Sequence, residues 1–283
     1  MIAKKGTLEY RNPKNNEGSP KRGNKQDENQ SFHVKHKKKD DSQIVCGIRP
    51  VIEAIGAGKQ IDKVLMQSSL TGSNAQELKA LIREKRLLLQ YVPVEKLNKM
   101  TDVNHQGVIA LVSPIVYCDF MTTLQSLIDS GKVPFIVMLD HITDVRNMGA
   151  IVRTAECTGV HAIVVPDRGS AQIGEDAIKS SAGALLRMPI CREPNFKTVI
   201  NLSRQLGLQV CAATEKGAVN YTDVDFTQPT LLILGSEDTG ISQEVIKLAD
   251  VKSRLPIVGQ VQSLNVSVAA GVFMYEVLRQ RLP

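Results

Sequence analysis

The sequence predicts a mixed α/β protein in which a small α/β domain precedes a larger domain built on a parallel sheet. Three observations support this prediction. In the second half of the chain, continuous apolar runs alternate with helical patterns, as is typical of parallel strands that are buried on both faces. Between residues 44 and 114, shorter helix and strand patterns form a group of their own. The first 43 residues are polar and basic and show neither pattern.

The N-terminal segment carries most of the net charge of the 283-residue chain, which is +6. Residues 1–43 contain 11 Lys or Arg against 6 Asp or Glu, a net charge of +5. The segment is predicted to be disordered, because it has too few large apolar side chains to offset the entropy of ordering. Its basic cluster at residues 35–39 fits two interpretations, a solvated leader or an arm that contacts RNA phosphates.

The small domain is predicted over residues 44–114. The apolar spacing indicates, in order, a helix, a strand, a helix and a strand, at residues 49–55, 63–66, 74–82 and 108–112. Asn74 is a candidate N-cap for the second helix. Residues 115–132 are expected to be a linker that contains a short helix.

The large domain is predicted over residues 133–283. Four continuous apolar runs indicate buried strands, at residues 135–139, 161–165, 208–213 and 231–234. Helical patterns separate and follow them, near residues 148–157, 174–182, 196–206, 242–249 and 266–281. The order of these elements predicts a parallel sheet with helices on both faces.

Composition and missing motifs exclude several classes of protein. No apolar run approaches the length of a membrane span, and the polar N-terminus does not resemble a secretory signal, so we expect a cytoplasmic protein. Five scattered cysteines without a CxxC pair argue against a disulfide framework and a zinc site, and we expect no metal. The sequence also lacks the GxGxxG, GxxxxGK[ST] and GxSxG patterns, which argues against a dinucleotide enzyme, a phosphate-loop NTPase and an α/β-hydrolase.

A polar loop and the helix after it follow the strand that ends at Asp140. Ligands of open α/β sheets bind beyond the carboxyl ends of the strands, so this loop is a candidate site. Asn147 and Arg153 are its candidate functional residues, in the loop and the first two turns of a helix that is expected to start near 147 or 148. The alternatives are that Asn147 caps the helix and that Arg153 forms a surface ion pair.

Two further segments place polar residues next to glycines. In the first, a buried strand leads into a turn that contains Glu237 between Gly235 and Gly240, and glycine permits close backbone approach and a positive φ. A ligand loop is the favoured interpretation, and an acid at a helix start is the alternative. In the second, Ser263, Leu264 and Asn265 precede a helix of small residues, where Ser263 could also be an N-cap.

These segments resemble the three motifs of the SpoU (TrmH) family of RNA methyltransferases. They read NMGAIVRTA at 147–155, LGSEDTG at 234–240 and PIVGQVQSLNVSVA at 256–269. Further similarity lies in CGIRPVIEA at 46–54, HQGV at 105–108 and KSSAGA at 179–184, so that the resemblance covers roughly residues 44–281. Two positions depart from the family pattern: Val145 stands where proline is common, and Asp238 stands where glycine is common.

The resemblance implies a fold and a reaction. The fold would be a parallel-sheet domain with a deep C-terminal trefoil knot, behind a small domain similar to ribosomal RNA-binding proteins. The reaction would transfer a methyl group from S-adenosylmethionine to a ribose 2′-hydroxyl of RNA. The two-domain arrangement is most similar to members that methylate a guanosine of large-subunit rRNA. A tRNA ribose 2′-O-methyltransferase and a non-catalytic RNA-binding ribosome-assembly factor of the same fold are the alternatives.

The resemblance also implies site residues and a homodimer. Arg153 would orient an RNA phosphate and the hydroxyl and would stabilise developing negative charge, because a guanidinium is a poor general base. The residues that would position the ribose and Arg153 are Asn147, Glu237, Ser263 and Asn265. The residues that would lie against the cofactor are Thr214, Gly235, Leu255 and Leu264. Two subunits would join to complete each active site.

Overall fold

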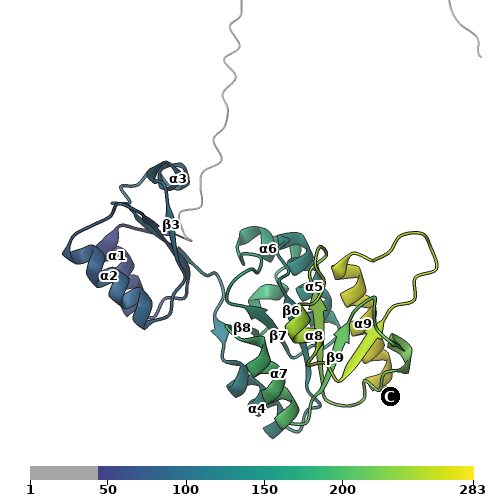
Figure 1. The fold of residues 1–283 in the computed structure, drawn as a ribbon. Coiled ribbons are helices and arrows are strands. Elements are labelled where there is room, and N and C mark those ends of the chain that lie inside the picture. Colours follow the sequence, from purple (N-terminus) through teal and green to yellow (C-terminus); the bar gives the residue numbers. More distant parts are fainter. Residues whose placement is uncertain (1–43) are drawn as a thin grey trace, which may run out of the picture. The chain divides into compact units, whose positions relative to one another are not determined.

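The computed structural model describes residues 44–283 (Figure 1). The predictions for residues 1–43, disorder and a possible RNA contact, lie outside the described residues. The described chain forms a small α/β unit followed by a larger one, as predicted from the patterns of apolar residues.

The small domain contains a mixed four-stranded sheet with the strand order β1-β4-β2-β3. Its strands are β1 (Ile44–Cys46), β2 (Ile61–Gln67), β3 (Leu89–Val92) and β4 (Val108–Val112). Only the β2–β3 pair among them is parallel. The helices are α1 (Ile48–Gly56), α2 (Ser73–Glu84) and α3 (Val94–Met100). Apolar residues of α1 and α2 pack on one face of the sheet, and Leu97 of α3 packs on the other.

The predicted cap of α2 is wrong. The helix begins at Ser73, and its N-cap is Gly72, which has a φ of 107° and so favours glycine. Asn74 lies inside the first turn, where its Oδ1 accepts a hydrogen bond of 3.1 Å from the Arg49 guanidinium. The side chain of Asn74 therefore links α2 to α1 instead of capping α2.

The large domain contains an eight-stranded sheet in which every pair of neighbouring strands is parallel. The strand order is β10-β12-β9-β11-β6-β7-β8-β5. The strands are β5 (Tyr117–Cys118), β6 (Phe135–Asp140), β7 (Ala162–Pro166), β8 (Ile190–Glu193), β9 (Gln209–Ala213), β10 (Val219–Asn220), β11 (Thr230–Gly235) and β12 (Val251–Arg254). The parallel sheet is confirmed, and the four predicted strands form its centre.

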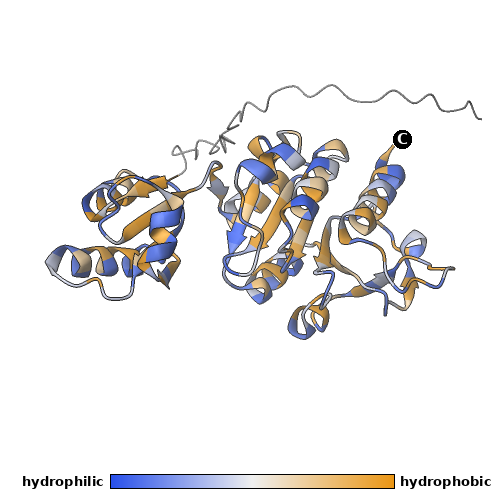
Figure 2. Cartoon of the chain, turned by 90° about the horizontal axis from the view of Figure 1, so that it is seen from above, coloured by the Kyte–Doolittle hydropathy of each residue, from blue (hydrophilic) through white to orange (hydrophobic). Residues whose placement is uncertain are grey.

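Helices cover both faces of this sheet, and its strands form a hydrophobic layer between them (Figure 2). One face packs against α5 (Val145–Cys157), α6 (Glu175–Ser180) and α9 (Val266–Arg281). The other packs against α4 (Phe120–Asp129), α7 (Phe196–Gln205) and α8 (Gln243–Ile246). Two 3₁₀ turns, η2 (Ala184–Leu186) and η3 (Tyr221–Asp223), complete the described elements. The segment predicted as a linker, residues 115–132, contains β5 and α4, and β5 pairs with β8.

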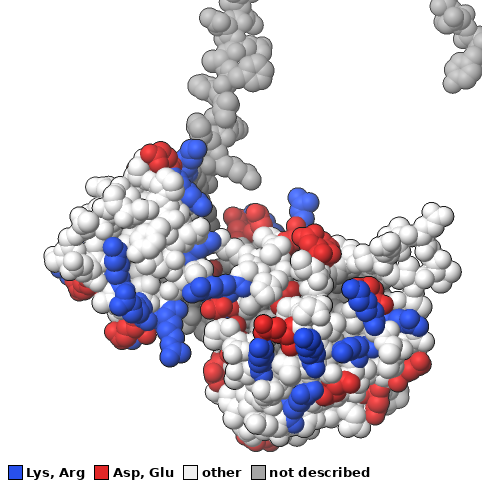
Figure 3. All heavy atoms as spheres, in the orientation of Figure 1, with Lys and Arg blue, Asp and Glu red and all other residues white. Residues whose placement is uncertain are grey.

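The carboxyl ends of the central strands meet at one edge of the sheet. β6 ends at Asp140 directly beside Gly235, the last residue of β11. After β12, residues 255–265 lead the chain back to α9, which packs against α5 on the face opposite α7 and α8. The resemblance places the knot in this returning segment. Figure 3 shows Lys and Arg interspersed with Asp and Glu on the face in view, in keeping with the nearly neutral charge of residues 44–283.

Candidate active site

Helix α5 starts earlier than predicted, and this frees the Asn147 side chain. Asp144 is the N-cap, and its Oδ1 accepts hydrogen bonds of 2.8 Å from the backbone N–H groups of Arg146 and Asn147. The alternative in which Asn147 caps the helix is therefore wrong. Val145 is the first helical residue, a position that suits proline because its N–H is not needed within the helix. The helix forms with valine there, so this departure from the family pattern leaves its start intact.

Three predicted catalytic residues from distant parts of the sequence form one hydrogen-bonded cluster. Asn147 Nδ2 donates to Glu237 Oε1 at 2.9 Å. Asn265 Nδ2 lies 2.5 Å from the same oxygen and 3.1 Å from Asn147 Oδ1. The backbone N–H of Val266 also points to Glu237 Oε1, at 3.4 Å. The structure thus joins the helix start of α5, the turn after β11 and the helix start of α9; we refer to Asn147, Glu237 and Asn265 as the polar cluster.

Asn265 has a second task in addition to its place in the polar cluster. It is the N-cap of α9, where its Oδ1 accepts from the backbone N–H groups of Ser267 at 2.9 Å and Val268 at 3.4 Å. The alternative that Ser263 caps this helix is therefore wrong. Ser263 does not join the polar cluster and instead lines the neighbouring cavity.

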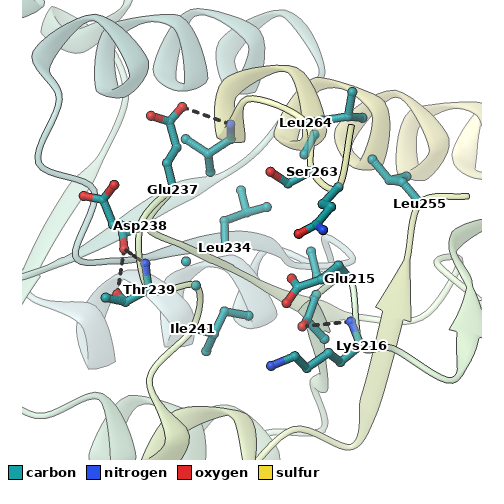
Figure 4. Close-up of a pocket in the computed structure, with 18 of the residues that line it drawn as sticks. Glu215, Lys216, Leu234, Glu237, Asp238, Thr239, Ile241, Leu255, Ser263 and Leu264 are labelled. Carbon is teal, nitrogen blue, oxygen red and sulfur yellow. Dashed lines mark hydrogen bonds between the residues drawn. The ribbon is translucent and has the colours of Figure 1, made fainter. Parts of the chain in front are cut away.

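A cavity of about 390 Å³ opens beside the polar cluster at the carboxyl ends of β9 and β11. Its walls come from residues 213–216 after β9, from the turn after β11, and from the loop that leads to α9. Figure 4 shows Glu215 and Lys216 on one side, Glu237–Thr239 on another and Ser263 and Leu264 on a third. All four residues that the resemblance assigns to the cofactor line this cavity: Thr214, Gly235, Leu255 and Leu264.

The glycine turn after β11 is closed by its own backbone. A Cβ on Gly235 would lie 2.1 Å from the carbonyl carbon of Gly240 and 2.1 Å from the nitrogen of Ile241, so only glycine fits there. Gly240 itself has a φ of 68°. Asp238 has no positive φ, so its departure from the family pattern causes no backbone strain. The close backbone approach predicted at Gly235 is therefore an approach of the turn's own backbone at Gly240 and Ile241.

Arg153 lies on the exposed surface of α5. Its guanidinium has no hydrogen-bond or ion-pair partner among residues 44–283. The alternative, in which Arg153 forms a surface ion pair, is therefore wrong for any partner within these residues. It lines neither the cavity nor the small space beside the polar cluster. The structure therefore brings together Asn147, Glu237 and Asn265 and leaves Arg153 apart from them as a free, solvent-facing cation.

A tight helix contact connects the first motif to the KSSAGA segment. A Cβ on Gly149 of α5 would lie 1.9 Å from Oγ of Ser180, the last residue of α6, and 2.9 Å from the nitrogen of Ser181, the C-cap of that helix. Ser180 Oγ in turn lies 3.3 Å from the Val145 carbonyl. The two segments therefore belong together because α6 packs directly on the turn of α5 that carries Asn147.

Sequence reasoning missed the pair formed by Asp140 and His141. Asp140 is buried, and its Oδ2 accepts a 2.7 Å hydrogen bond from the backbone N–H of Ser242. Its Oδ1 lies 2.6 Å from His141 Nδ1. The signal was present in the sequence, since an aspartate directly after five apolar strand residues must find partners for its carboxylate.

Other chemistries find little support in the described chain. Burial raises the pKa of the thiols of Cys191 and Cys211 to about 12, so neither serves as a thiolate nucleophile near neutral pH. Within residues 44–283, no group of His, Cys, Asp and Glu side chains has the arrangement of a metal site. None of the helices in that range has the length and apolarity needed to cross a membrane.

Comparisons with known proteins agree with the motifs. Residues 134–275 match the SpoU rRNA Methylase family, and residues 44–118 match the family described as RNA 2′-O ribose methyltransferase substrate binding. The chain belongs to the SpoU methyltransferase family. A protein of Staphylococcus haemolyticus named as a TrmH family tRNA/rRNA methyltransferase is 35% identical over 84% of this chain and 96% of its own length. A Bacillus subtilis protein of the same family name is 33% identical over the same shares of both chains.

Solved structures extend the similarity to the fold. The crystal structure of the SpoU methyltransferase AviRb from Streptomyces viridochromogenes, in complex with AdoMet, is 28% identical and covers 84% of this chain and 90% of its own, with a TM-score of 0.53. An AdoMet-bound rRNA methyltransferase from Sinorhizobium meliloti, 24% identical with a TM-score of 0.55 over 85% and 88% of the two chains, shares the fold. The protein is thus a SpoU-family RNA methyltransferase, and this family uses S-adenosylmethionine.

Proposed function

We propose that this enzyme transfers a methyl group from S-adenosylmethionine to the 2′-hydroxyl of a guanosine ribose in large-subunit rRNA, as a homodimer in the cytoplasm. The observation that carries the proposal is that Glu237 takes part in both the cavity and the polar cluster. This residue lines the cavity assigned to the cofactor and also accepts hydrogen bonds from Asn147 and Asn265. A methyl donor in the cavity would therefore adjoin a set of polar groups able to hold a hydroxyl.

The cavity suits the proposed cofactor in size and chemistry. Its volume of about 390 Å³ lies within the range of about 300–1,000 Å³ that is common for small-ligand sites. Apolar side chains of Leu234, Leu255 and Leu264 offer contacts for an adenine ring. Glu215 and Lys216 offer charges opposite to those of an amino-acid ammonium and carboxylate. When bound, the cofactor supplies a methyl group made electrophilic by the positive charge on its sulfur.

The polar cluster and Arg153 have separate tasks in this proposal. A ribose hydroxyl is a weak nucleophile until its proton is removed or strongly polarised, and it must be aligned with the methyl group. Asn147, Glu237 and Asn265 hold one another in place and would position the ribose. Arg153 has no partner among the described residues, so its guanidinium is available to bind a phosphate. Because Arg153 lies apart from the polar cluster of its own chain, it would stabilise negative charge that develops on the oxygen in a site completed by a second subunit. Ser263, in the cavity wall, would contact the ribose from the cofactor side.

The choice of rRNA rests on the presence of the front domain together with the family of the large domain. Residues 44–118 match a substrate-binding family, and the family of the large domain is described as an rRNA methylase family. The curated relatives carry names that include both tRNA and rRNA, so tRNA is the competing substrate. Mapping of ribose methylation in both RNA classes decides between them.

The proposed dimer is supported by an apolar surface on α9. Val268 and Tyr275 are 51% and 55% exposed, one on either side of Gly271 along the helix. They line a shallow groove together with Tyr221, Gly271 and Val272. A second copy covering this surface would remove two large apolar side chains from water. Sedimentation equilibrium should give twice the chain mass, and Tyr275→Asp should yield a monomer.

Methyl transfer to unmodified rRNA fragments and tRNA tests the proposed reaction. The wild-type enzyme should transfer the methyl group of labelled S-adenosylmethionine to rRNA, and digestion should recover it as 2′-O-methylguanosine. Arg153→Ala should lower the single-turnover rate about 10²–10³-fold, since one electrostatic group that acts on developing charge is lost, with cofactor affinity nearly unchanged. Arg153→Lys should restore little, because a point charge does not reproduce a two-pronged guanidinium.

Arg187→Ala is the matched control, because Arg187 is another exposed arginine of the large domain and pairs with Glu156 at 3.3 Å. It should keep the wild-type rate. Methylation of tRNA alone would replace the proposed substrate. A wild-type rate for Arg153→Ala would overturn the assignment of Arg153, and failure to methylate either RNA would overturn the proposed function.

A further inference from the structure

His141 has a backbone conformation that few residues other than glycine adopt. Its φ is 60°, in the left-handed region, which strains a residue that has a Cβ. Directly before it, Asp140 ends strand β6 with a side chain that is only 1% exposed, whereas the imidazole of His141 is 56% exposed. The chain therefore maintains a strained residue whose ring gains little from burial.

The imidazole is nevertheless held firmly in one orientation. Its Nδ1 lies 2.6 Å from Asp140 Oδ1, and a carboxylate can only accept, so Nδ1 carries the proton and donates. The flank of the ring packs against Gly169, where a Cβ would lie only 2.7 Å from His141 Cδ2. Because Nδ1 faces the buried carboxylate, Nε2 is the ring nitrogen left for another partner. Among the described residues, Nε2 has no hydrogen-bond partner.

The position of His141 relates it to the candidate active site. The next residue, Ile142, lines a small space together with Asn147 and Glu237 of the polar cluster. Asp140 connects the imidazole to the other side of the site, because its second oxygen accepts from Ser242 just after the glycine turn. Arg146, on the first turn of α5, is exposed and has no side-chain partner within residues 44–283. An oriented imidazole and a free cation thus lie on the segment that leads into the polar cluster.

We propose that His141 is a positioning residue for the RNA substrate, with Nε2, the acceptor nitrogen of an imidazole that carries its proton on Nδ1, accepting a hydrogen bond from a ribose hydroxyl or a base N–H of a nucleotide next to the methylated ribose. This inference rests on the proposed function, because it requires RNA at the site. Asp140 fixes the ring so that little conformational entropy is lost when RNA binds. The left-handed backbone leaves the ring largely exposed directly after the buried Asp140. The competing explanation is purely structural: the imidazole only satisfies Asp140.

The substitution His141→Asn separates these two explanations. Asparagine tolerates a positive φ, and its side-chain amide can occupy the place of Nδ1, so the hydrogen bond to Asp140 is kept while Nε2 is lost. We expect the KM for RNA and the Kd for RNA in direct binding to rise about five- to tenfold, the effect of one net hydrogen bond. The kcat at saturating RNA, the Kd for S-adenosylmethionine and the Tm should stay at wild-type values.

His141→Gly provides a second variant in which the backbone strain is relieved. Its RNA affinity should fall as in His141→Asn even though its backbone is better suited to the left-handed conformation. Ala182→Gly is the control for strain relief alone, because Ala182 has a φ of 51° and loses only a methyl group. Its RNA affinity should remain that of the wild type.

The outcomes are distinguishable from failure of the proposed function. RNA affinity unchanged in His141→Asn would overturn the inference and leave His141 as a partner of Asp140 only. A lower Tm and weaker cofactor binding with unchanged RNA affinity would also support that structural role. Absence of methyl transfer by the wild-type enzyme would overturn the proposed function, while the direct RNA-binding measurement would still decide the part played by His141.

Discussion

Asn265 offers the sharpest perturbation of the site, because its two side-chain atoms have different tasks. Oδ1 caps α9, and Nδ2 donates to Glu237 and Asn147. Asn265→Asp keeps an oxygen acceptor for the cap. It replaces the Nδ2 donor by a carboxylate oxygen, so that two negatively charged side chains face each other at Glu237. Asn265→Ala removes both functions. We expect single-turnover methyl transfer to fall at least about 10²-fold in both variants, as is typical when a group that aligns the reacting atoms is lost.

The cost to stability can be worked out from the same contacts. Loss of the cap in Asn265→Ala costs about 0.5–2 kcal/mol, and each lost hydrogen bond costs about 0.5–1.5 kcal/mol. In Asn265→Asp the cap remains, and the repulsion of two unit charges about 4 Å apart is about 1 kcal/mol in water. Asn265 and Glu237 are both exposed, so the repulsion stays near this aqueous value. The aspartate variant should therefore be folded and still bind S-adenosylmethionine while its turnover is lost.

Urea unfolding, calorimetric binding of the cofactor and single-turnover methyl transfer are the three measurements. Asn195→Asp is the matched control, because Asn195 is the N-cap of α7 and accepts from the Lys197 N–H at 2.9 Å. The same substitution there should leave methyl transfer unchanged. A near wild-type rate for Asn265→Asp would refute the reasoning and reduce Asn265 to a helix cap.

Three further predictions concern the cofactor, the N-terminal segment and the amino-terminal end of the sheet. S-adenosylmethionine at 100 times its Kd should add about 2.7 kcal/mol to the free energy of unfolding in a thermal-shift assay, and Gly235→Ala should abolish this gain because its Cβ cannot fit in the closed turn. Deletion of residues 1–43 should flatten the salt dependence of RNA affinity, and an unchanged slope would favour the solvated-leader interpretation. Burial, together with the charges of Lys132 and Arg281, lowers the pKa of His161 below its ordinary value of 6.5. The unfolded state therefore binds more protons than the folded state, and the free energy of unfolding should fall as the pH drops below 6.5. His161→Asn, which can still accept from the Phe135 N–H, should reduce this pH dependence in urea titrations.

The sequence predicted the centre of the large sheet better than its edges. β6 and β11 are continuous apolar runs that are buried on both faces, so their composition alone marks them as strands. β12 reads Val-Lys-Ser-Arg and β10 has only two residues, so neither has a pattern of its own. These strands form because the neighbouring strand β9 offers its hydrogen-bonding edge to β12, which in turn pairs with β10. Pairing with distant residues is not visible in a local pattern.

The candidate site, too, could be predicted from the sequence only in part. The motifs identified Asn147, Glu237 and Asn265, but not the contacts that connect them, because those contacts depend on residues 90 and 118 positions from Asn147. The alternatives to a functional role made Asn147 and Ser263 the caps of α5 and α9, whereas the structure has Asp144 and Asn265 as the caps. Both alternatives failed for one reason. Several polar residues precede each helix, and only the path of the chain decides which of them reaches the free N–H groups.

The two glycines with the tightest surroundings show what the small residues of the motifs contribute. Gly235 lets the turn close on Gly240 and Ile241, so contacts within the turn place the backbone of Glu237. Gly149 lets α6 pack on the turn of α5 that carries Asn147. Neither glycine has a side chain to offer the polar cluster, yet each allows the backbone of one of its members to take its place. The long motifs therefore encode two kinds of requirement, a few side chains that act on the substrate and small residues that place the backbone for them, which is why a match to the whole pattern says more about function than any single polar residue.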